Sequence, residues 1–232
     1  MMTQSPSSLK TFINCPALYK ARYIDKIIKF TGNAATERGE LIHKRMEELC
    51  LGSALSPDWG TNGDGAKLYG QNFINEVLKI GSLREKGVKI YVERQIAINA
   101  KGEIVDWWDK SAILRSRIDL FIDMEYAGAV IDWKTGRTPG DPLQLLINAM
   151  CLYPLNPKTR YDGYFVYLDQ AKVDSSTMIF DTAPLNSENG KVLELRLWLE
   201  KLERAYAENT FPATANNDCR WCDLRSNCDS RS

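Results

Sequence analysis

The stretch Ala129-Val130-Ile131-Asp132-Trp133-Lys134-Thr135-Gly136 is the most informative part of the chain. The apolar run Ala129-Val130-Ile131 predicts a buried strand, and Thr135-Gly136 predicts a turn that leaves the end of the strand open. Side chains alternate between the two faces of a strand, so Asp132 and Lys134 point the same way. The stretch therefore predicts a carboxylate and a cation side by side next to a loop, where binding and catalytic residues are often found.

Apolar periodicity predicts further elements on both sides of this strand. Alternating patterns predict strands over 88–98, 112–123, 161–168 and 172–180, and the core strand itself covers 129–134. Helical spacing predicts helices over 5–15, 18–28, 36–50, 66–80, 142–152 and 192–209. This order of helices and strands predicts an α/β fold, with a mixed central sheet flanked by helices.

Length and composition fit one soluble globular domain. The chain has 232 residues, of which 44% are hydrophobic, and its 30 basic and 30 acidic residues cancel. Any site for a polyanion must therefore be a local patch. No apolar stretch approaches the roughly 18 residues of a membrane span, and the N-terminus lacks a secretion pattern. We expect a single cytoplasmic domain over 1–232, with a helical part (1–85), a sheet core (86–182) and a C-terminal helix and tail (183–232).

A second carboxylate, Asp119, lies in the strand predicted over 112–123. Alternation puts Asp119 on one face of this strand and three apolar residues on the opposite, buried face: Ile118, Leu120 and Ile122. If the three strands pair as a meander, Asp119 and Asp132 come close to Glu93 of the first strand. Carboxylates gathered in this way repel one another unless a hard cation such as Mg²⁺ or Mn²⁺ binds between them.

Two interpretations of these acids follow from the residues alone. A bound divalent metal activates water and neutralises charge on a phosphoryl group, and Lys134 would assist as a fixed cation. The alternative is a surface network of ion pairs, of Asp119 with Arg117 and of Asp132 with Lys134 or Arg137. Such exposed ion pairs would not indicate a functional site. The position of the triplet at a strand end favours the first interpretation.

The chain resembles a known family in three places: Ile118-Asp119, Val130 to Gly136, and Gln144-Leu145. These segments resemble the PD-(D/E)XK nuclease superfamily. The run from Glu37 to His43 resembles the R-G-x-x-x-H signature of its RecB-like branch, and Ser7-Ser8-Leu9 with Cys15-Pro16 is also similar to that branch. Together the motifs cover residues 7 to 228. The resemblance implies a restriction-endonuclease-like core.

The resemblance also implies roles for single residues. His43, Asp119 and Asp132 would be metal ligands, together with the backbone carbonyl of Trp133. Lys134 would be the catalytic lysine, and Gln144 would steady the site or contact the DNA backbone. Supporting residues would be Glu93, Arg38 and Arg117. Without the resemblance, a lone histidine beside an apolar helix stripe is more often structural.

The chain departs from the family pattern at two positions. Ser116 stands where the family often has glycine, and Asn148 stands where a tyrosine often follows the glutamine. These departures concern the support of the site rather than its metal ligands.

Cysteines cluster near the C-terminus as Cys219-x₂-Cys222-x₅-Cys228, with Cys15 far upstream. Thiolates select zinc or an iron–sulfur cluster, and the spacing alone does not separate the two. The pattern resembles the iron–sulfur RecB-like nucleases, which include the AddB-type nuclease domain and the Cas nuclease of spacer acquisition. It implies a [4Fe–4S] cluster that joins the two ends of the chain. The other two cysteines, Cys50 and Cys151, are expected to be buried apolar residues.

The resemblance implies a Mg²⁺- or Mn²⁺-dependent DNA nuclease, an exonuclease on single strands or DNA ends. It would act in recombination, repair or CRISPR adaptation, with proteins of those pathways as partners, and an oligomer is compatible with it. Four tryptophans are candidates to stack on unpaired bases, although most tryptophans are simply packed: Trp107, Trp108, Trp133 and Trp221. The alternative is a DNA-binding or assembly module with little chemistry, against which the intact Asp119, Asp132 and Lys134 argue.

Overall fold

The protein is built around a six-stranded mixed sheet. The computed structural model describes residues 2–28, 32, 34–51, 80, 82–136, 138–170, 172–180 and 182–228. The strands are β1 (Lys89–Asn99), β2 (Ile104–Val105), β3 (Ala112–Asp123), β4 (Gly128–Lys134), β5 (Arg160–Tyr167) and β6 (Lys172–Ile179), in the order β2-β1-β3-β4-β5-β6. Only β4 and β5 run parallel. The predicted α/β fold with a mixed sheet, and the meander of β1, β3 and β4, are confirmed.

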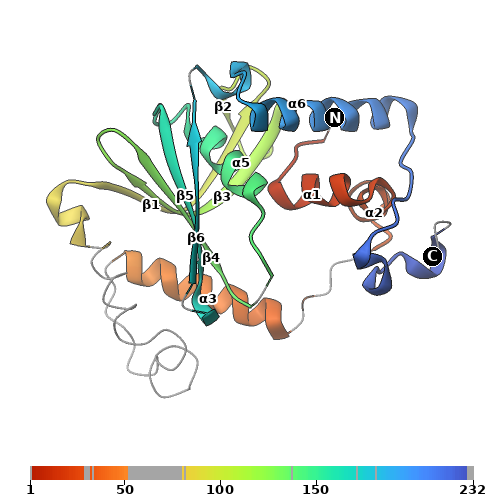
Figure 1. Cartoon of the computed structure of the whole chain (residues 1–232), viewed down its shortest axis with the longest axis horizontal. Coiled ribbons are helices and arrows are strands. Elements are labelled where there is room, and N and C mark those ends of the chain that lie inside the picture. The colour runs from red at the N-terminus through yellow and green to blue at the C-terminus, as the bar shows by residue number, and fades with distance from the viewer. Residues whose placement is uncertain are drawn as a thin grey trace.

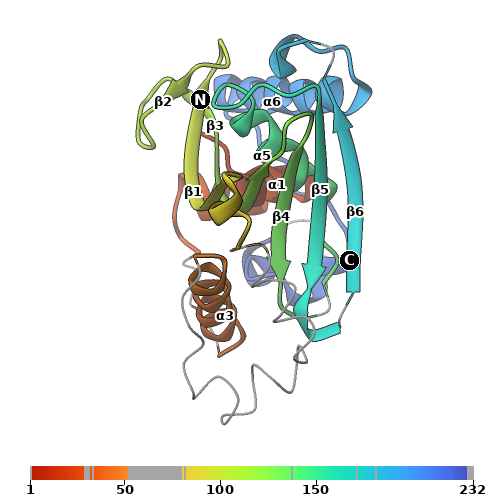
Figure 2. The ribbon, with the colours of Figure 1, turned by 90° about the vertical axis from the view of Figure 1, so that its left-hand side faces the viewer.

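Helices cover the sheet on both sides. They are α1 (Pro6–Asn14), α2 (Pro16–Tyr19), α3 (Ala34–Cys50), α5 (Pro142–Leu152) and α6 (Gly190–Glu208). Helix α5 lies between the sheet and the outer helices α1 and α6 (Figure 1), and α3 lies at the lower end of the sheet, well apart from α6 (Figure 2). Every residue from Leu145 to Leu152 is buried, as expected for a helix covered all round.

The apolar side chains form two cores, one on each face of the sheet. The larger core joins α1, α5 and α6 to the sheet through residues such as Phe12, Leu145 and Leu199. The smaller core joins Ile42 and Met46 of α3 to residues of β1, β3 and β4. Helix α3 is therefore held to the sheet by its own core, which fixes the side chains on its inner face relative to the strand ends.

Strands β3 and β4 diverge beside the acidic residues. Their ladder covers Asp123 to Leu120 of β3 and stops at the pair Leu120–Ile131. On the other side of β3, the pairs with β1 continue on either side of Asp119 but skip Asp119 and Glu93, and Glu93 has a φ of 47°. A non-glycine residue with positive φ is uncommon and marks an irregular backbone. The sheet thus opens at Asp119.

This irregularity corrects the predicted alternation along β3. Ile118 packs in the larger core together with Phe121, whereas Leu120 and Ile122 pack in the smaller core. Residues three apart cannot share a face of a regular strand, so Ile118 is not on the face of Leu120 and Ile122 as predicted. The backbone changes face at Asp119.

Most predicted elements are present with bounds within two residues of the prediction. The helix predicted over 18–28 is instead the short α2 followed by a π-helix over Lys20–Ile24, closed by a hydrogen bond from the Asp25 N–H to the Lys20 carbonyl (2.9 Å), and Lys26 with a φ of 54° stops it. The two-residue strand β2 was not predicted. The helix predicted over 66–80 lies outside the described residues except for Ile80. Among the described helices, none has the length and apolar character required to cross a membrane.

Candidate metal and catalytic site

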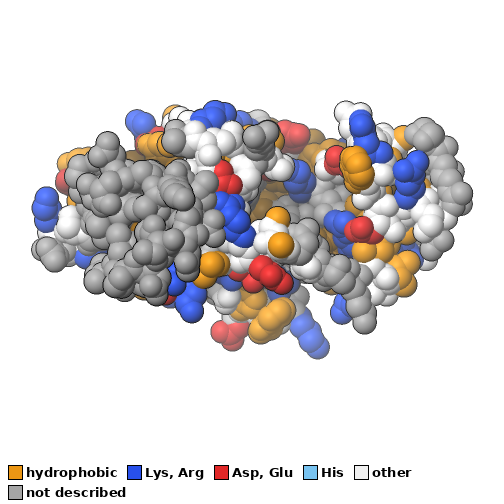
Figure 3. Space-filling view, turned by 90° about the horizontal axis from the view of Figure 1, so that it is seen from below, with side chains coloured by type: hydrophobic (Ala, Val, Ile, Leu, Met, Phe, Trp, Pro, Cys, Tyr) orange, Lys and Arg blue, Asp and Glu red, His pale blue; other side chains and the backbone are white. Residues whose placement is uncertain are grey.

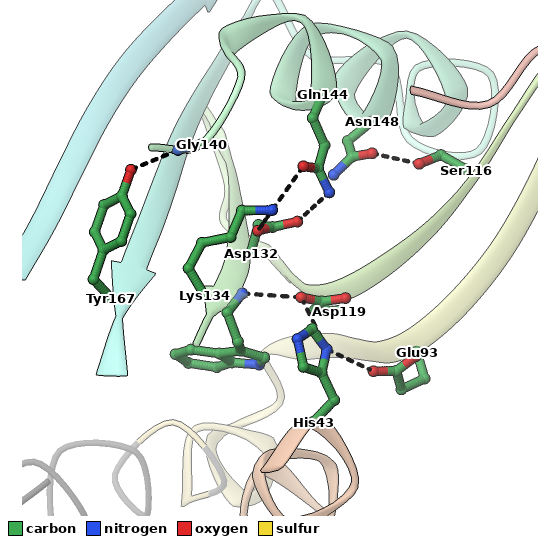
Figure 4. A network of polar contacts seen from close by, with 11 residues as sticks. His43, Glu93, Ser116, Asp119, Asp132, Lys134, Gly140, Gln144, Asn148 and Tyr167 are labelled. Carbon is green, nitrogen blue, oxygen red and sulfur yellow. Dashed lines mark hydrogen bonds and ion pairs between the residues drawn. The ribbon is translucent and has the colours of Figure 1, made fainter. Parts of the chain in front are cut away.

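Three side chains from different elements meet where β3 and β4 diverge (Figure 4). His43 comes from α3, Glu93 from β1 and Asp119 from β3. The Nδ1 atom of His43 lies 3.4 Å from Oδ2 of Asp119 and 3.8 Å from Oε1 of Glu93. One ligand atom from each residue lies within 4.8 Å of the other two, and this is the only such group of three or more His, Cys, Asp or Glu residues in the described part of the chain.

Local contacts fix both carboxylates. Asp119 is 7% exposed, and its Oδ2 accepts a hydrogen bond from the backbone N–H of Trp133 (2.9 Å). That bond crosses the gap where the β3–β4 ladder has ended. Glu93 forms an ion pair with Arg117, with 3.0 Å between Nε and Oε2. The ion pair expected between Arg117 and Asp119 is thus made with Glu93 instead.

The three residues fit a divalent cation. Burial lowers the pKa of His43, but the carboxylates of Asp119 and Glu93 outweigh it and raise that pKa to about 10, so a metal at this site would displace a proton from the imidazole. Nδ1 of His43 is buried and faces both carboxylates. The carboxylate oxygens of Glu93 and Asp119 are the ligand type that Mg²⁺ and Mn²⁺ take in proteins, whereas an imidazole nitrogen is the ligand type of metals such as zinc and iron.

A second group, on β4 and α5, adjoins the first (Figure 4). Asp132 is 3% exposed and its Oδ2 lies 2.7 Å from Nζ of Lys134. Nζ of Lys134 also donates to Oε1 of Gln144 (2.8 Å), while Nε2 of Gln144 donates to Oδ1 of Asp132. Burial and the charge of Asp119 raise the pKa of Asp132 to about 7, against the opposing effect of Lys134. The group is a closed triangle of acid, ammonium and amide.

The predicted metal ligands are split between the two groups of side chains. Asp132 was expected to share the metal with His43 and Asp119, but the compact group contains Glu93 in its place. The ion pair of Asp132 with Lys134 was predicted by the alternative interpretation, the network of ion pairs. The other partner that this interpretation offered for Asp132, Arg137, lies outside the described residues. Asp132 is nonetheless buried and Lys134 half-buried, and both adjoin the His43–Glu93–Asp119 group rather than lying on the open surface. The assignment of metal ligands stays a prediction.

Arg38 lies away from both groups. Its guanidinium forms two hydrogen bonds with Asp169 (2.9 and 2.7 Å), and Asp169 also accepts from the backbone N–H of Gly136 (2.9 Å). At the next residue of α3, a Cβ on Gly39 would lie 3.4 Å from Oγ1 of Thr135. This contact region positions α3 against the loop after β4. Sequence reasoning places Asp169 in a turn but does not identify it as a partner of Arg38, because the two residues are 131 positions apart.

The two departures from the family pattern meet in space. Oγ of Ser116 on β3 donates a hydrogen bond to Oδ1 of Asn148 on α5, and both residues are buried (Figure 4). Nδ2 of Asn148 is buried and has no hydrogen-bond partner among the residues that the structure describes. One turn earlier, α5 carries Gln144. The pair therefore links β3 to the helix that orients Lys134.

The four clustered cysteine positions lie around one hollow of about 690 Å³. It is lined by Cys15, Cys219, Cys222 and Cys228. The tail is tied to the N-terminal helices by the ion pair of Arg22 with Asp223 (2.8 Å) and by a hydrogen bond from Nδ2 of Asn216 to the carbonyl of Asn14 (3.1 Å). The four sulfur atoms are farther apart than the ligand atoms of His43, Glu93 and Asp119. All four cysteines are described, and no three of their sulfurs lie within 4.8 Å of one another.

The remaining cysteines are buried, as predicted. Cys50 and Cys151 are both fully buried, and burial raises the pKa of each thiol to about 12. Both thiols stay protonated at neutral pH and are not nucleophiles.

Comparisons with known proteins agree with this arrangement. The family model of the PD-(D/E)XK nuclease superfamily matches residues 3–229. The crystal structure of SSO0001 aligns with a TM-score of 0.50 at 12% identity, over 100% of this chain and 88% of that chain, which shows likeness of fold alone. An alkaline exonuclease from Laribacter hongkongensis (LHK-Exo) aligns over 90% of this chain and 95% of that chain at 13% identity, but its TM-score of 0.30 is too low to support an argument. No curated protein matches the chain.

Proposed function

Because the chain belongs to the PD-(D/E)XK nuclease superfamily, we propose that it is a Mg²⁺- or Mn²⁺-dependent DNA nuclease. One observation carries the proposal: the compact His43–Glu93–Asp119 group adjoins the partly buried triangle of Asp132, Lys134 and Gln144. A structural ion-pair network does not require two sets of carboxylates to converge at a break in the sheet.

His43, Asp119 and Asp132 would hold the metal, with the carbonyl of Trp133, and Glu93 joins them on geometric grounds. A divalent cation supplies a water of lowered pKa and neutralises charge on a phosphoryl group. The negatively charged carboxylates of Glu93 and Asp119 lie close together, and the ion pair with Arg117 holds Glu93 in place. Trp133 fixes Asp119 through its backbone N–H, so the carboxylate is already oriented before a ligand arrives.

Lys134 is the cation for the reacting phosphate. Its ammonium is held by Asp132 on one side and by Gln144 on the other, which leaves its third N–H free of these two partners. That N–H orients a water or stabilises the negative charge that develops on the phosphoryl oxygens. Gln144 acts by positioning Lys134 and Asp132 together.

The substrate is DNA, as single strands or ends, cleaved as an exonuclease. The pathway is recombination, repair or CRISPR adaptation, with proteins of that pathway as partners, in the cytoplasm. These finer assignments rest on the family resemblance of the RecB-like signature around His43.

The test is cleavage by two variants with a matched control. Lys134→Ala and Asp132→Ala should lose Mg²⁺- or Mn²⁺-dependent cleavage of labelled DNA and keep the circular dichroism spectrum of the parent. Lys172→Ala removes an exposed lysine of β6 that pairs with Asp174 (2.9 Å) and should cleave normally. Unchanged cleavage in both site variants would refute the assignment. DNA binding without cleavage in any metal would favour the assembly module.

Cys15, Cys219, Cys222 and Cys228 hold a [4Fe–4S] cluster under the same proposal. Support comes from the four cysteines around a single hollow, and a four-iron cluster separates its thiolates more widely than one zinc ion does. Protein purified without oxygen should be brown and carry about four irons per chain. Colourless protein with one zinc per chain would contradict the proposal.

A further inference from the structure

The gap between β3 and β4 continues into a hollow that runs away from the site. The hollow is about 550 Å³, within the usual range of ligand pockets of about 300–1,000 Å³. Lys134 and Gln144 line one part of it, and Trp107 and Arg115 line another. It lies between the part of β3 that β4 does not cover and the loop that leads from β4 into α5. The triangle of the proposed site thus opens directly onto it.

The lining contains cationic side chains of the kind that contact a phosphate backbone, most of them held in ion pairs. Four of its side chains are cationic, namely Lys10, Arg115, Arg117 and Lys134, and one is acidic, Asp141. Lys10 and Asp141 pair with each other at 3.3 Å. Arg117 pairs with Glu93 and Lys134 with Asp132, so Arg115 is the lining cation that forms no ion pair with a described residue. The face seen from below carries its described Lys and Arg side chains mixed with acidic and hydrophobic ones (Figure 3).

Two tryptophans stand next to these cations. Trp107 and Trp108, in the connection between β2 and β3, have ring centroids 6.4 Å apart and planes at 82°. The guanidinium carbon of Arg115 lies 5.2 Å from the Trp107 centroid and 4.9 Å from the Trp108 centroid. Trp108 is 79% exposed, although its ring is one of the largest apolar side chains.

The loop that carries the tryptophans is itself ordered by hydrogen bonds. Oδ1 of Asp109 accepts from the N–H and from Oγ of Ser111 (both 2.7 Å), and the N–H of Asp109 donates to the carbonyl of Asp106 (2.9 Å). The exposed ring of Trp108 is therefore presented on a fixed turn. A fixed aromatic face beside a cationic groove is the arrangement by which proteins bind unpaired nucleotides, because bases stack on the ring while cations follow the phosphates.

We propose that Trp107, Trp108 and Arg115 form a stacking subsite for an unpaired base of a DNA single strand, whose phosphates lie along the hollow toward Lys134. The inference rests on the proposed nuclease function and adds the residues that would recognise the single strand. A base within a duplex is stacked and paired, so it is not available to this platform unless the duplex opens. The subsite therefore selects single strands or frayed ends.

The test measures binding in the absence of cleavage. A fluorescent oligodeoxythymidylate, the same strand with abasic sites, and a duplex are titrated with protein in EDTA, so that a failure of the nuclease proposal does not affect the result. Trp108→Ala should weaken binding of the oligodeoxythymidylate roughly 5-fold or more and leave binding of the abasic strand unchanged. Trp107→Leu, which keeps an apolar side chain at a half-buried position, should show the same selectivity.

The matched control is Tyr126→Ala, which removes an aromatic side chain that is 81% exposed in the turn between β3 and β4. It should bind all three ligands as the parent does. Unchanged binding of the base-containing strand by both tryptophan variants would overturn the proposal. An equal loss for the abasic strand or the duplex would also overturn it, since the rings would then not be acting on unpaired bases. Cleavage by the parent in Mn²⁺, measured separately, decides the nuclease proposal alone.

Discussion

At the scale of single residues, Gln144 is the side chain on which the order of the triangle depends. It accepts from Lys134 and donates to Asp132, so its loss frees both partners. We predict that Gln144→Ala lowers kcat by roughly 10- to 100-fold, as loss of a supporting contact in a metal site commonly does, with little change in KM. The measurement is steady-state cleavage of labelled DNA.

Gln170 offers a control for that change. Its Nε2 donates to the carbonyl of Gly136 (2.9 Å) in the loop after β4, and no hydrogen bond joins it to Lys134 in the described structure. Gln170→Ala should keep kcat close to that of the parent. Equal kcat values for the Gln144 and Gln170 variants would show that Gln144 does not position the lysine.

The buried pair of Ser116 and Asn148 makes a prediction about stability. Ser116→Ala leaves Oδ1 of Asn148 without its donor in an apolar site, which should cost about 1–3 kcal/mol of unfolding free energy. Asn148→Leu should cost a similar amount by leaving the Ser116 hydroxyl unpaired. The double variant Ser116→Ala/Asn148→Leu should lose less than the sum, because no buried polar group remains. Urea unfolding measures all three, and additive losses would contradict the pairing.

The residues of the candidate site were only partly predictable. Asp119, Asp132 and Lys134 stand in strands whose apolar patterns place them at adjoining ends, so the sequence indicates their approach. Glu93 was expected close to the two aspartates if the strands paired as a meander, and was named as a supporting residue, but its place beside His43 depends on a positive φ that no pattern of residue types announces. Arg38 was expected near the metal, yet it binds Asp169, a partner more than a hundred residues away.

At the scale of elements, the ion pair of Arg38 with Asp169 fixes α3 against the loop after β4. Hydrogen bonds from Arg38 hold the pKa of Asp169 below its ordinary value. A lowered pKa means that the pair stabilises the fold above the ordinary pKa of an aspartate, about 4, and that this stability is lost as pH falls through the lowered value.

We therefore predict that Asp169→Asn lowers Tm at pH 7 by a small amount, corresponding to at most about 1 kcal/mol. The difference in Tm between parent and variant should shrink as the pH falls below about 4. Thermal unfolding at a series of pH values measures it. A difference that is constant down to pH 3, or that grows there, would contradict the ion-pair explanation.

Elements with strong local signals were predicted most closely. Strand β3 and helix α5 have the predicted bounds, and α5 begins where Asp141 caps its N-terminus and Pro142 takes the first position. Strand β2 was not predicted because two residues are too few to show an alternating pattern of apolar and polar side chains. The helix predicted over 18–28 was wrong beyond Ile24, because the backbone changes to a π-helix and then to a left-handed residue, which helical spacing does not reveal.

At the scale of the whole molecule, the C-terminal tail lies beside α1 and α2 (Figure 1), and the three segments line the hollow that contains the four cysteines. If these cysteines hold a cluster, its loss should free the tail from α1 and α2. We predict that Cys222→Ser loses iron and lowers Tm, and a loss of about 2 kcal/mol corresponds to roughly 4–8 °C in a chain of this length. Lys134→Ala, far from the tail in sequence, should retain iron and Tm. A Cys222→Ser protein with unchanged iron content would rule out this cysteine as a ligand.

The most direct test of the central claim is the metal dependence of cleavage by the parent and by Asp119→Asn. The asparagine keeps an oxygen for the N–H of Trp133 but removes the negative charge from the metal group. End-labelled single- and double-stranded DNA is incubated with Mg²⁺, Mn²⁺, Ca²⁺ or EDTA. The parent should cleave in Mg²⁺ or Mn²⁺ and not in EDTA, and Asp119→Asn should leave the DNA intact in every condition while it still folds. Cleavage that continues in EDTA, or equal cleavage by the two proteins, would contradict the claim.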